Sequence, residues 1–180
     1  AIDEKHNRLI IADMSQGDLK STPTLPDIIV VDIETGVAKR MAQSHPSMLP
    51  EVEGGYALNP IVIDAKFEYV YFGALNARTI YRVPAASFDD EETLKNSIEK
   101  YGTKSFCDGI AIDANDIIYI TNLERSEFGV YNKKDGFKTF ATLPEGQSWP
   151  DGLYVANDGY LYGAVDQLDR TAALNNGKDA

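Results

Sequence analysis

Three polar side chains stand at the same point of a recurring pattern, directly before a short apolar run. They are Asn59, Asp108 and Asp151, which open the runs NPIVID, DGIAID and DGLYVA. Carboxylate and amide oxygens that converge on one point suit Ca²⁺ or another divalent ion, which needs about six oxygen ligands. An Asp or Asn at such a place can instead accept backbone N–H bonds in a turn. Three occurrences at one position favour a binding site over three unrelated turns.

Three further polar residues should face the same point, because they follow strands that return to it. In consecutive antiparallel strands the chain alternates direction, so each second strand ends beside the start of the first. Asn122, Glu124 and Gln167 lie at or just after such ends. The sequence therefore predicts six ligand-binding residues around the mouth of one central channel: Asn59, Asp108, Asn122, Glu124, Asp151 and Gln167.

The elements that must position these residues are paired strands. The stretch FCDGIAIDANDIIYITN, from Phe106 to Asn122, contains two apolar runs, Gly109 to Asp113 and Ile117 to Thr121, joined by a turn of Ala, Asn and Asp. Alternating isoleucines in both runs fit strands that bury one face. The same unit recurs from Asn59 to Leu75 and from Pro150 to Val165.

The spacing of this unit predicts the fold. Asp3, Asp64, Asp113 and Ala156 occupy its equivalent position, at intervals of roughly 40–60 residues. Four short strands per interval are typical of a β-propeller blade. We therefore predict an all-β chain with one domain over residues 1–180. It forms a partial β-propeller of about three and a half four-stranded blades, at about 1–44, 59–105, 106–143 and 149–170, with a tail at 171–180.

A propeller normally closes a ring of about four to eight blades, which protects the strand edges. Three and a half blades cannot close, and Ala1 lies inside a strand by analogy with Ala111. The sequence therefore predicts a piece of a longer protein. One short helix is also expected, over Phe88 to Asn96, because acidic residues crowd its first turn and Ser87 could cap it.

Composition excludes several classes of partner. The chain has 17 Lys and Arg against 28 Asp and Glu, a net charge of −11, and a sequence pI near 4.5. This charge argues against nucleic acid and is compatible with a cationic ligand. No apolar run approaches the roughly 18 residues of a membrane span. Cys107 is the only cysteine, so no internal disulfide can form. It is expected to pack as a small apolar residue rather than act with His45 as a nucleophile.

Several stretches resemble the bacterial branch of the yellow/major royal jelly protein family. They are FCDGIAIDANDIIYITNLERSEFGVY (Phe106–Tyr131), SWPDGLYVANDGYLYGAVDQLDR (Ser148–Arg170), NARTIYRVPAASF (Asn76–Phe88) and IEKYGTK (Ile98–Lys104). The resemblance implies a six-bladed propeller, secreted or periplasmic, with a ligand pocket at one end of its channel. Insect members are associated with pigment chemistry or with binding small amines, whereas bacterial members lack a settled activity.

A wider resemblance is to the gluconolactonase, regucalcin and strictosidine synthase superfamily, where a Glu, an Asn and an Asp hold a divalent metal. It implies that Asn59 and Asp108 are metal ligands, because they match the Asn and the Asp of that set. Two positions depart from the patterns. Pro60 replaces the Gly usual after that Asn, and Asp169 stands where the bacterial yellow-like series commonly has His.

Three functions fit these observations, and whether the chain is an enzyme stays open. The favoured one is a yellow-type propeller that binds a small molecule, cationic or aromatic, at the channel mouth. The alternative is a metal-dependent hydrolase of the lactonase kind, in which Ca²⁺ or another divalent ion polarises a carbonyl and activates water. A protein-interaction platform with an inert channel is the third, and no long exposed apolar run supports it.

Overall fold

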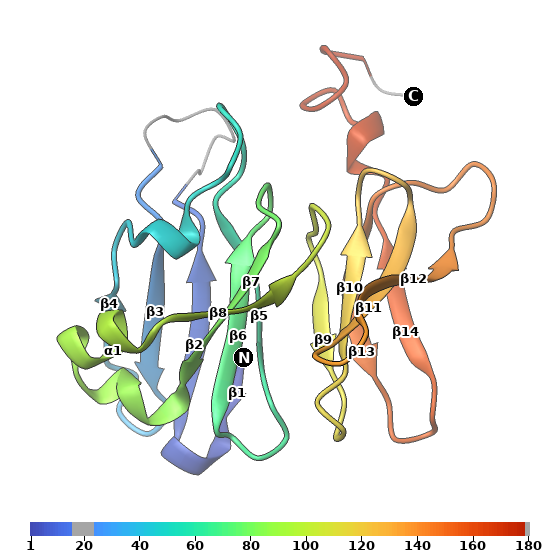
Figure 1. Ribbon diagram of the computed structural model, residues 1–180. Helices are drawn as coiled ribbons and strands as arrows, with labels where there is room; N and C mark the ends of the chain where they lie inside the picture. The colour runs from blue at the N-terminus through green and yellow to red at the C-terminus, as the bar shows by residue number, and fades with distance from the viewer. Residues whose placement is uncertain (16–23, 179–180) are drawn as a thin grey trace.

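The computed structural model describes residues 1–15 and 24–178, and it folds into four antiparallel sheets (Figure 1). The first sheet holds β1 (Ile2–Asp3), β2 (Arg8–Asp13), β3 (Asp27–Asp32) and β4 (Ala38–Met41). The second holds β5 (Leu58–Ile63), β6 (Tyr69–Ala74), β7 (Thr79–Pro84) and β8 (Glu99–Thr103). The third holds β9 (Ile110–Ile112), β10 (Ile118–Asn122), β11 (Glu127–Asn132) and β12 (Gly136–Thr142). The fourth is the pair β13 (Pro150–Val155) and β14 (Leu161–Val165).

In every sheet each strand pairs with the one that follows it in the chain, so each sheet is a simple meander. The first strands of the second, third and fourth sheets lie side by side, since β5 contacts β9 and β9 contacts β13, and the first sheet contacts β5 through β2. The predicted all-β partial propeller, with three four-stranded sheets and half of a fourth, is therefore confirmed. The assignment of all 180 residues to a single domain stays a prediction.

In the residues that the structure describes, helical structure is confined to short segments. They are the 3₁₀ turns η1 (Glu4–His6), η2 (Pro46–Met48), η3 (Ala85–Asp89) and η4 (Leu168–Arg170), and one helix, α1 (Glu91–Ser97). The cap predicted for this helix at Ser87 is wrong. Asp90 is extended and its side chain accepts the Thr93 N–H at 2.8 Å, whereas Ser87 Oγ donates to the Pro84 carbonyl. Among the residues that the structure describes, no helix is long and apolar enough to cross a membrane.

Two apolar clusters fill the spaces between the sheets. One lies between the first and second sheets and includes Ile10, Ile28 and Phe72, all fully buried. The other lies between the second and third sheets and includes Ile118 and Ile120. The expected alternation of buried isoleucines is present in β10, whereas Ile110 and Ile112 of β9 are only half-buried and pack against the edge of the second cluster. Cys107 is also fully buried in the second cluster, as its predicted packing role requires.

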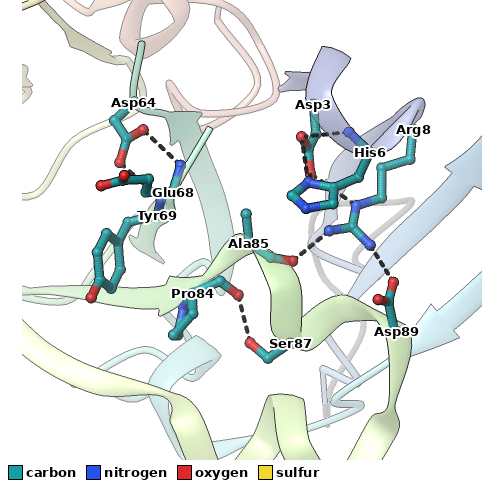
Figure 2. A network of polar contacts seen from close by, with 10 residues as sticks. All are labelled: Asp3, His6, Arg8, Asp64, Glu68, Tyr69, Pro84, Ala85, Ser87 and Asp89. Carbon is teal, nitrogen blue, oxygen red and sulfur yellow. Dashed lines mark hydrogen bonds and ion pairs between the residues drawn. The ribbon is translucent and has the colours of Figure 1, made fainter. Parts of the chain in front are cut away.

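The aspartates that share one position of the internal repeat hold the turns at the end of the sheets away from the predicted channel mouth. Asp64 accepts the backbone N–H groups of Glu68 and Tyr69 (Figure 2). Asp3 instead accepts the His6 ring at 2.8 Å and Arg8 Nε at 2.9 Å. These contacts keep the turns short, so that each following strand starts in register.

Arg8 also joins the first two sheets. Its guanidinium donates to Asp89 at 2.9 Å and to the Ala85 carbonyl, both in η3 after the second sheet's third strand (Figure 2). The guanidinium lies 5.4 Å from the centre of the Phe88 ring. A buried arginine with this many partners fixes the relative position of the two sheets.

Candidate functional site

A pocket of about 200 Å³ opens where the inner strands β5, β9 and β13 begin. Its lining consists of Met14, Tyr56, Asn59, Leu75, Asp108, Trp149, Asp151, Leu168 and Leu174. A groove of about 250 Å³ follows the inner strands between the sheets, and it shares Asn59, Asp108 and Asp151 with the pocket. The structure therefore brings these three sequence-predicted residues together, at the point where the pocket meets the groove between the sheets.

The Asp108 carboxylate is held by a donor on each oxygen. Asn59 Nδ2 donates to Oδ1 at 2.6 Å, and Trp149 Nε1 donates to Oδ2 at 2.7 Å. Trp149 has a φ of 56°, in the left-handed region that bulky side chains rarely adopt. Backbone strain of this kind gathers at ligand sites, where the surrounding structure holds it in place. Sequence reasoning did not single out Trp149, although it is the only tryptophan in the chain.

Burial and neighbouring carboxylates raise the pKa values of both carboxyls. Burial raises the pKa of Asp108, while the hydrogen bonds from Trp149 and Asn59 oppose that rise. The pKa of Asp151 is raised to about 7, first by burial, then by the charge of Asp108 and by the hydrogen bond and charge of Asp166. The pocket thus contains one carboxyl that changes its protonation state near neutral pH.

A glycine lets the third and fourth sheets approach closely beneath the pocket. A Cβ atom added at Gly109 would lie 1.8 Å from the Asp151 carbonyl oxygen, so only glycine fits there. This approach brings the backbone of Asp151 against the segment that carries Asp108. The Asp-Gly pair of the sequence therefore serves two purposes, a carboxylate for the pocket and space for the neighbouring strand.

A buried lysine supports the wall of the pocket that contains Leu75. Lys104 is 4% exposed, and its Nζ donates to the carbonyls of Ala74 and Ala77 at 2.6 Å each. The Ser105 and Leu75 carbonyls lie at 3.3 and 3.4 Å. Four carbonyl partners satisfy the buried ammonium, which in turn fixes the turn after β6 against the segment that leads to β9.

The other three predicted residues lie outside the lining of this pocket. Asn122 is buried and donates to Glu127 at 3.2 Å. Glu124 forms an ion pair with Arg78, through bonds of 2.7 and 3.0 Å. Gln167 is half-buried with a φ of 55°, directly before η4. Strand position predicts the face on which a residue lies, whereas the side chains of Asn122 and Glu124 turn toward partners on that face.

The predicted metal ligands, Asn59 and Asp108, do not present free oxygens to a Ca²⁺ ion. Both oxygens of Asp108 accept hydrogen bonds from neutral N–H groups, and the amide of Asn59 presents its NH₂ group rather than its oxygen to the carboxylate. Within residues 1–15 and 24–178, no group of three or more His, Cys, Asp or Glu could hold a metal ion. Ca²⁺ needs about six oxygen ligands. The described residues therefore do not fit a calcium site by themselves.

Comparison with known proteins agrees with this fold. A gluconolactonase from Xanthomonas campestris superposes with a TM-score of 0.64 at 9% identity, covering 89% of this chain and 51% of that one. A periplasmic gluconolactonase from Pseudomonas aeruginosa gives 0.61 at 13% identity, covering 92% and 49%. A protein of unknown function from Bacteroides thetaiotaomicron gives 0.63 at 13% identity, covering 92% and 38%. The chain thus spans about half or less of the length of these structures, and at such identities the likeness shows the fold alone.

Sequence comparison identifies the family more directly. Comparison with curated protein sequences gives no match. The family model described as major royal jelly protein matches residues 30–178, which include all three residues that share the pocket and the groove. The expectation drawn from the repeated Asp-Gly units and the WPDG segment is therefore confirmed, and the chain belongs to the major royal jelly protein family.

Proposed function

We propose that the pocket binds a small organic cation, and that an aromatic amine is the ligand class that suits it best. The observation that carries this proposal is the carboxyl pair Asp108 and Asp151, half-buried at the base of a pocket whose wall includes Tyr56 and Trp149. An ammonium group beside the carboxyls offsets their repulsion, and aromatic faces attract both cations and rings. The apolar remainder of the lining favours a ligand with a hydrocarbon body.

The protonation state of Asp151 links binding to pH. With a pKa of about 7, this carboxyl holds a proton on a large fraction of molecules at neutral pH. A cation in the pocket favours the ionised form, so binding releases a proton and becomes weaker as the pH falls below about 7. This behaviour distinguishes a cation from a neutral ligand of the same shape.

We further propose that the protein is exported, secreted or periplasmic, and that its propeller has six blades. Membership of the major royal jelly protein family supports both statements. The Pseudomonas aeruginosa gluconolactonase that shares the fold is described as periplasmic, which is consistent with export.

Isothermal titration with phenethylamine tests the proposal. We expect Asp151→Asn to weaken binding about tenfold, because a charge-assisted contact to the ammonium is lost. Titration in buffers of different ionisation enthalpy should show proton release for the native protein and not for Asp151→Asn. The matched control is Asp116→Asn, which removes a carboxylate from the turn at the far end of β9. Equal affinities for all three proteins would refute a cation site at Asp151.

A hydrolase of the lactonase kind is the second candidate, and the pKa of Asp151 favours it. A carboxyl with a pKa of about 7 can accept a proton from an attacking water at neutral pH. Assays of D-glucono-1,5-lactone hydrolysis, with and without added Ca²⁺, test this alternative. Hydrolysis above the uncatalysed rate that is lost in Asp151→Asn would favour it over simple binding, and Ca²⁺ dependence would show that ligands beyond the described residues complete a metal site.

A further inference from the structure

The hydroxyl of Thr121 is the acceptor for the backbone segment that carries Asp108. The backbone N–H groups of Asp108 and Gly109 both donate to Thr121 Oγ1, at 3.0 Å each. Thr121 lies in β10 and is fully buried. One side-chain oxygen therefore receives two consecutive N–H groups directly beneath the pocket.

These two N–H groups need a side-chain partner because they precede the sheet ladder. The paired residues of β9 begin at Ile110. The Gly109 carbonyl still accepts the Thr121 N–H at 3.1 Å, but the N–H groups of Asp108 and Gly109 donate to the Thr121 hydroxyl and not to a main-chain carbonyl. Gly109 is buried between β10 and the Asp151 carbonyl. A buried N–H without an acceptor costs free energy comparable to a lost hydrogen bond. The hydroxyl thus satisfies both N–H groups and, together with the main-chain bond from Thr121 N–H to the Gly109 carbonyl, holds this segment against β10.

The repeat itself does not require a hydroxyl at this position. Strand register equates Thr121 with one residue in each of the other three sheets. Ile118 pairs with Ile112, the residue before Asp113, and Leu9, Val70 and Leu161 pair in the same way with the residues before Asp3, Asp64 and Ala156. The equivalent residues are Ala12, Gly73 and Ala164. In the second sheet, Pro60 stands where Gly109 does and has no N–H to satisfy. The hydroxyl is therefore found, among the four described sheets, only in the one that carries Asp108.

We infer that Thr121 is a positioning residue for the ligand site: its hydroxyl fixes the Asp108 segment so that the carboxylate meets Asn59, Trp149 and the ligand. This inference rests on the proposed function for its effect on binding, but not for its effect on the geometry of Asp108. The strand that carries Thr121 is fixed in turn, because Ser105 Oγ donates to the Thr121 carbonyl at 2.8 Å. Ser105 follows Lys104, so the positioning contact continues into the carbonyl cage of that lysine.

The test uses two variants that differ by a single oxygen atom, Thr121→Ala and Thr121→Ser. Alanine is what the first and fourth sheets carry at this position, so the strand accommodates it. Trp149 is the only tryptophan, so its indole N–H gives a single NMR signal that reports its bond to Asp108. We expect the indole signal of Thr121→Ala to move toward that of a free indole and to exchange faster with water. Thr121→Ser should keep the native signal.

Thr139→Ala is the matched control, because it removes the same hydroxyl within the same sheet, where Thr139 Oγ1 donates to Glu127 at 3.0 Å. It should leave the indole signal unchanged. An unchanged signal in Thr121→Ala overturns the inference, and so does an equal displacement in Thr121→Ser or Thr139→Ala.

Titration of the whole protein with phenethylamine measures the effect of Thr121 on ligand affinity. We expect Thr121→Ala to bind about tenfold more weakly than the native protein, and Thr121→Ser to restore most of the affinity. If the native protein does not bind phenethylamine, the proposed function fails for this ligand class, and the indole signal alone decides whether Thr121 positions Asp108. If the native protein binds and Thr121→Ala binds equally well, the role of Thr121 in binding is refuted.

Discussion

At the scale of single residues, the two carboxyls of the pocket differ because they receive different partners. Asp108 accepts N–H bonds on both oxygens, and these bonds stabilise its ionised form against burial. Asp151 has the charge of Asp108 beside it and shares a hydrogen bond with Asp166, both of which favour its protonated form. The proton of the group therefore belongs mainly to Asp151.

The raised pKa of Asp151 predicts a dependence of stability on pH. A carboxyl whose pKa is higher in the folded state binds a proton there first, so it contributes stability that is lost as the pH rises through about 7. Asp151→Asn carries no such charge. We expect this variant to melt at a higher temperature than the native protein at pH 8, and the difference to shrink as the pH falls toward about 5.

Thermal unfolding of both proteins at a series of pH values provides the measurement. If the melting temperatures run parallel across the whole range, Asp151 does not titrate near pH 7 in the folded protein, and the electrostatic account of the pocket is wrong.

Sequence reasoning identified the residues of the site to the extent that their places repeat. Asn59, Asp108 and Asp151 precede equivalent strands, and the sheets bring such starts together. Trp149 could not be found in that way, because a φ of 56° turns its indole toward Asp108 and no repeat position encodes that turn. Glu124 was assigned from its place at a strand end, and its ion pair with Arg78 depends on a side chain 46 residues earlier in the chain.

At the scale of elements, the contact between β9 and β13 depends on the absence of a side chain at Gly109. We expect Gly109→Ala to destabilise the protein by ~1–3 kcal/mol or more, because the added Cβ would overlap the Asp151 carbonyl. Gly152→Ala is the control one strand away, since its nearest neighbour would be Ala164 at 3.8 Å, an ordinary contact.

Denaturant unfolding of the two alanine variants measures this difference. Equal midpoints would mean that the sheets can separate at Gly109 without cost, in contradiction to the close approach of the two strands. A loss of stability confined to Gly109→Ala, together with weaker ligand binding, would connect strand packing directly to the pocket.

The bounds of the strands and the helix show which parts of the fold are determined by the local sequence. The run predicted at Ile117 to Thr121 forms β10, Ile118–Asn122, one residue later at each end, because polar turns flank its alternating pattern on both sides. The predicted helix begins at Glu91 instead of Phe88, since Phe88 is needed in the core beside Arg8 and its segment forms a 3₁₀ turn. Tertiary packing thus overrode a local capping signal.

At the scale of the whole molecule, the fourth sheet leaves a strand edge unpaired in the described part of the chain. β14 pairs only with β13 there, and large aromatic side chains of this hairpin are exposed. Tyr154 is 62% exposed and Tyr162 is 54% exposed. Unpaired edges with exposed apolar side chains are sites of association.

We therefore expect residues 1–180, produced alone, to associate in solution in a concentration-dependent way. Tyr162→Lys places a charge within the β14 edge and should reduce association, whereas Tyr160→Lys, just before that strand, should reduce it less. Sedimentation velocity at several concentrations provides the measurement. A single monomeric species that unfolds cooperatively at every concentration would contradict the expected exposure of this edge.

The carbonyl cage of Lys104 also determines how the site responds to its surroundings. Four main-chain oxygens around one positive charge form the coordination that a free potassium or ammonium ion would otherwise occupy. Here the ion is covalently tethered, so its effective concentration at the cage does not depend on the solution. No chelator can remove it, and no dilution of salt can empty the cage. The wall of the pocket at Leu75 therefore needs no dissolved cation to balance these carbonyls, whereas the charge at the pocket itself changes with the protonation of Asp151.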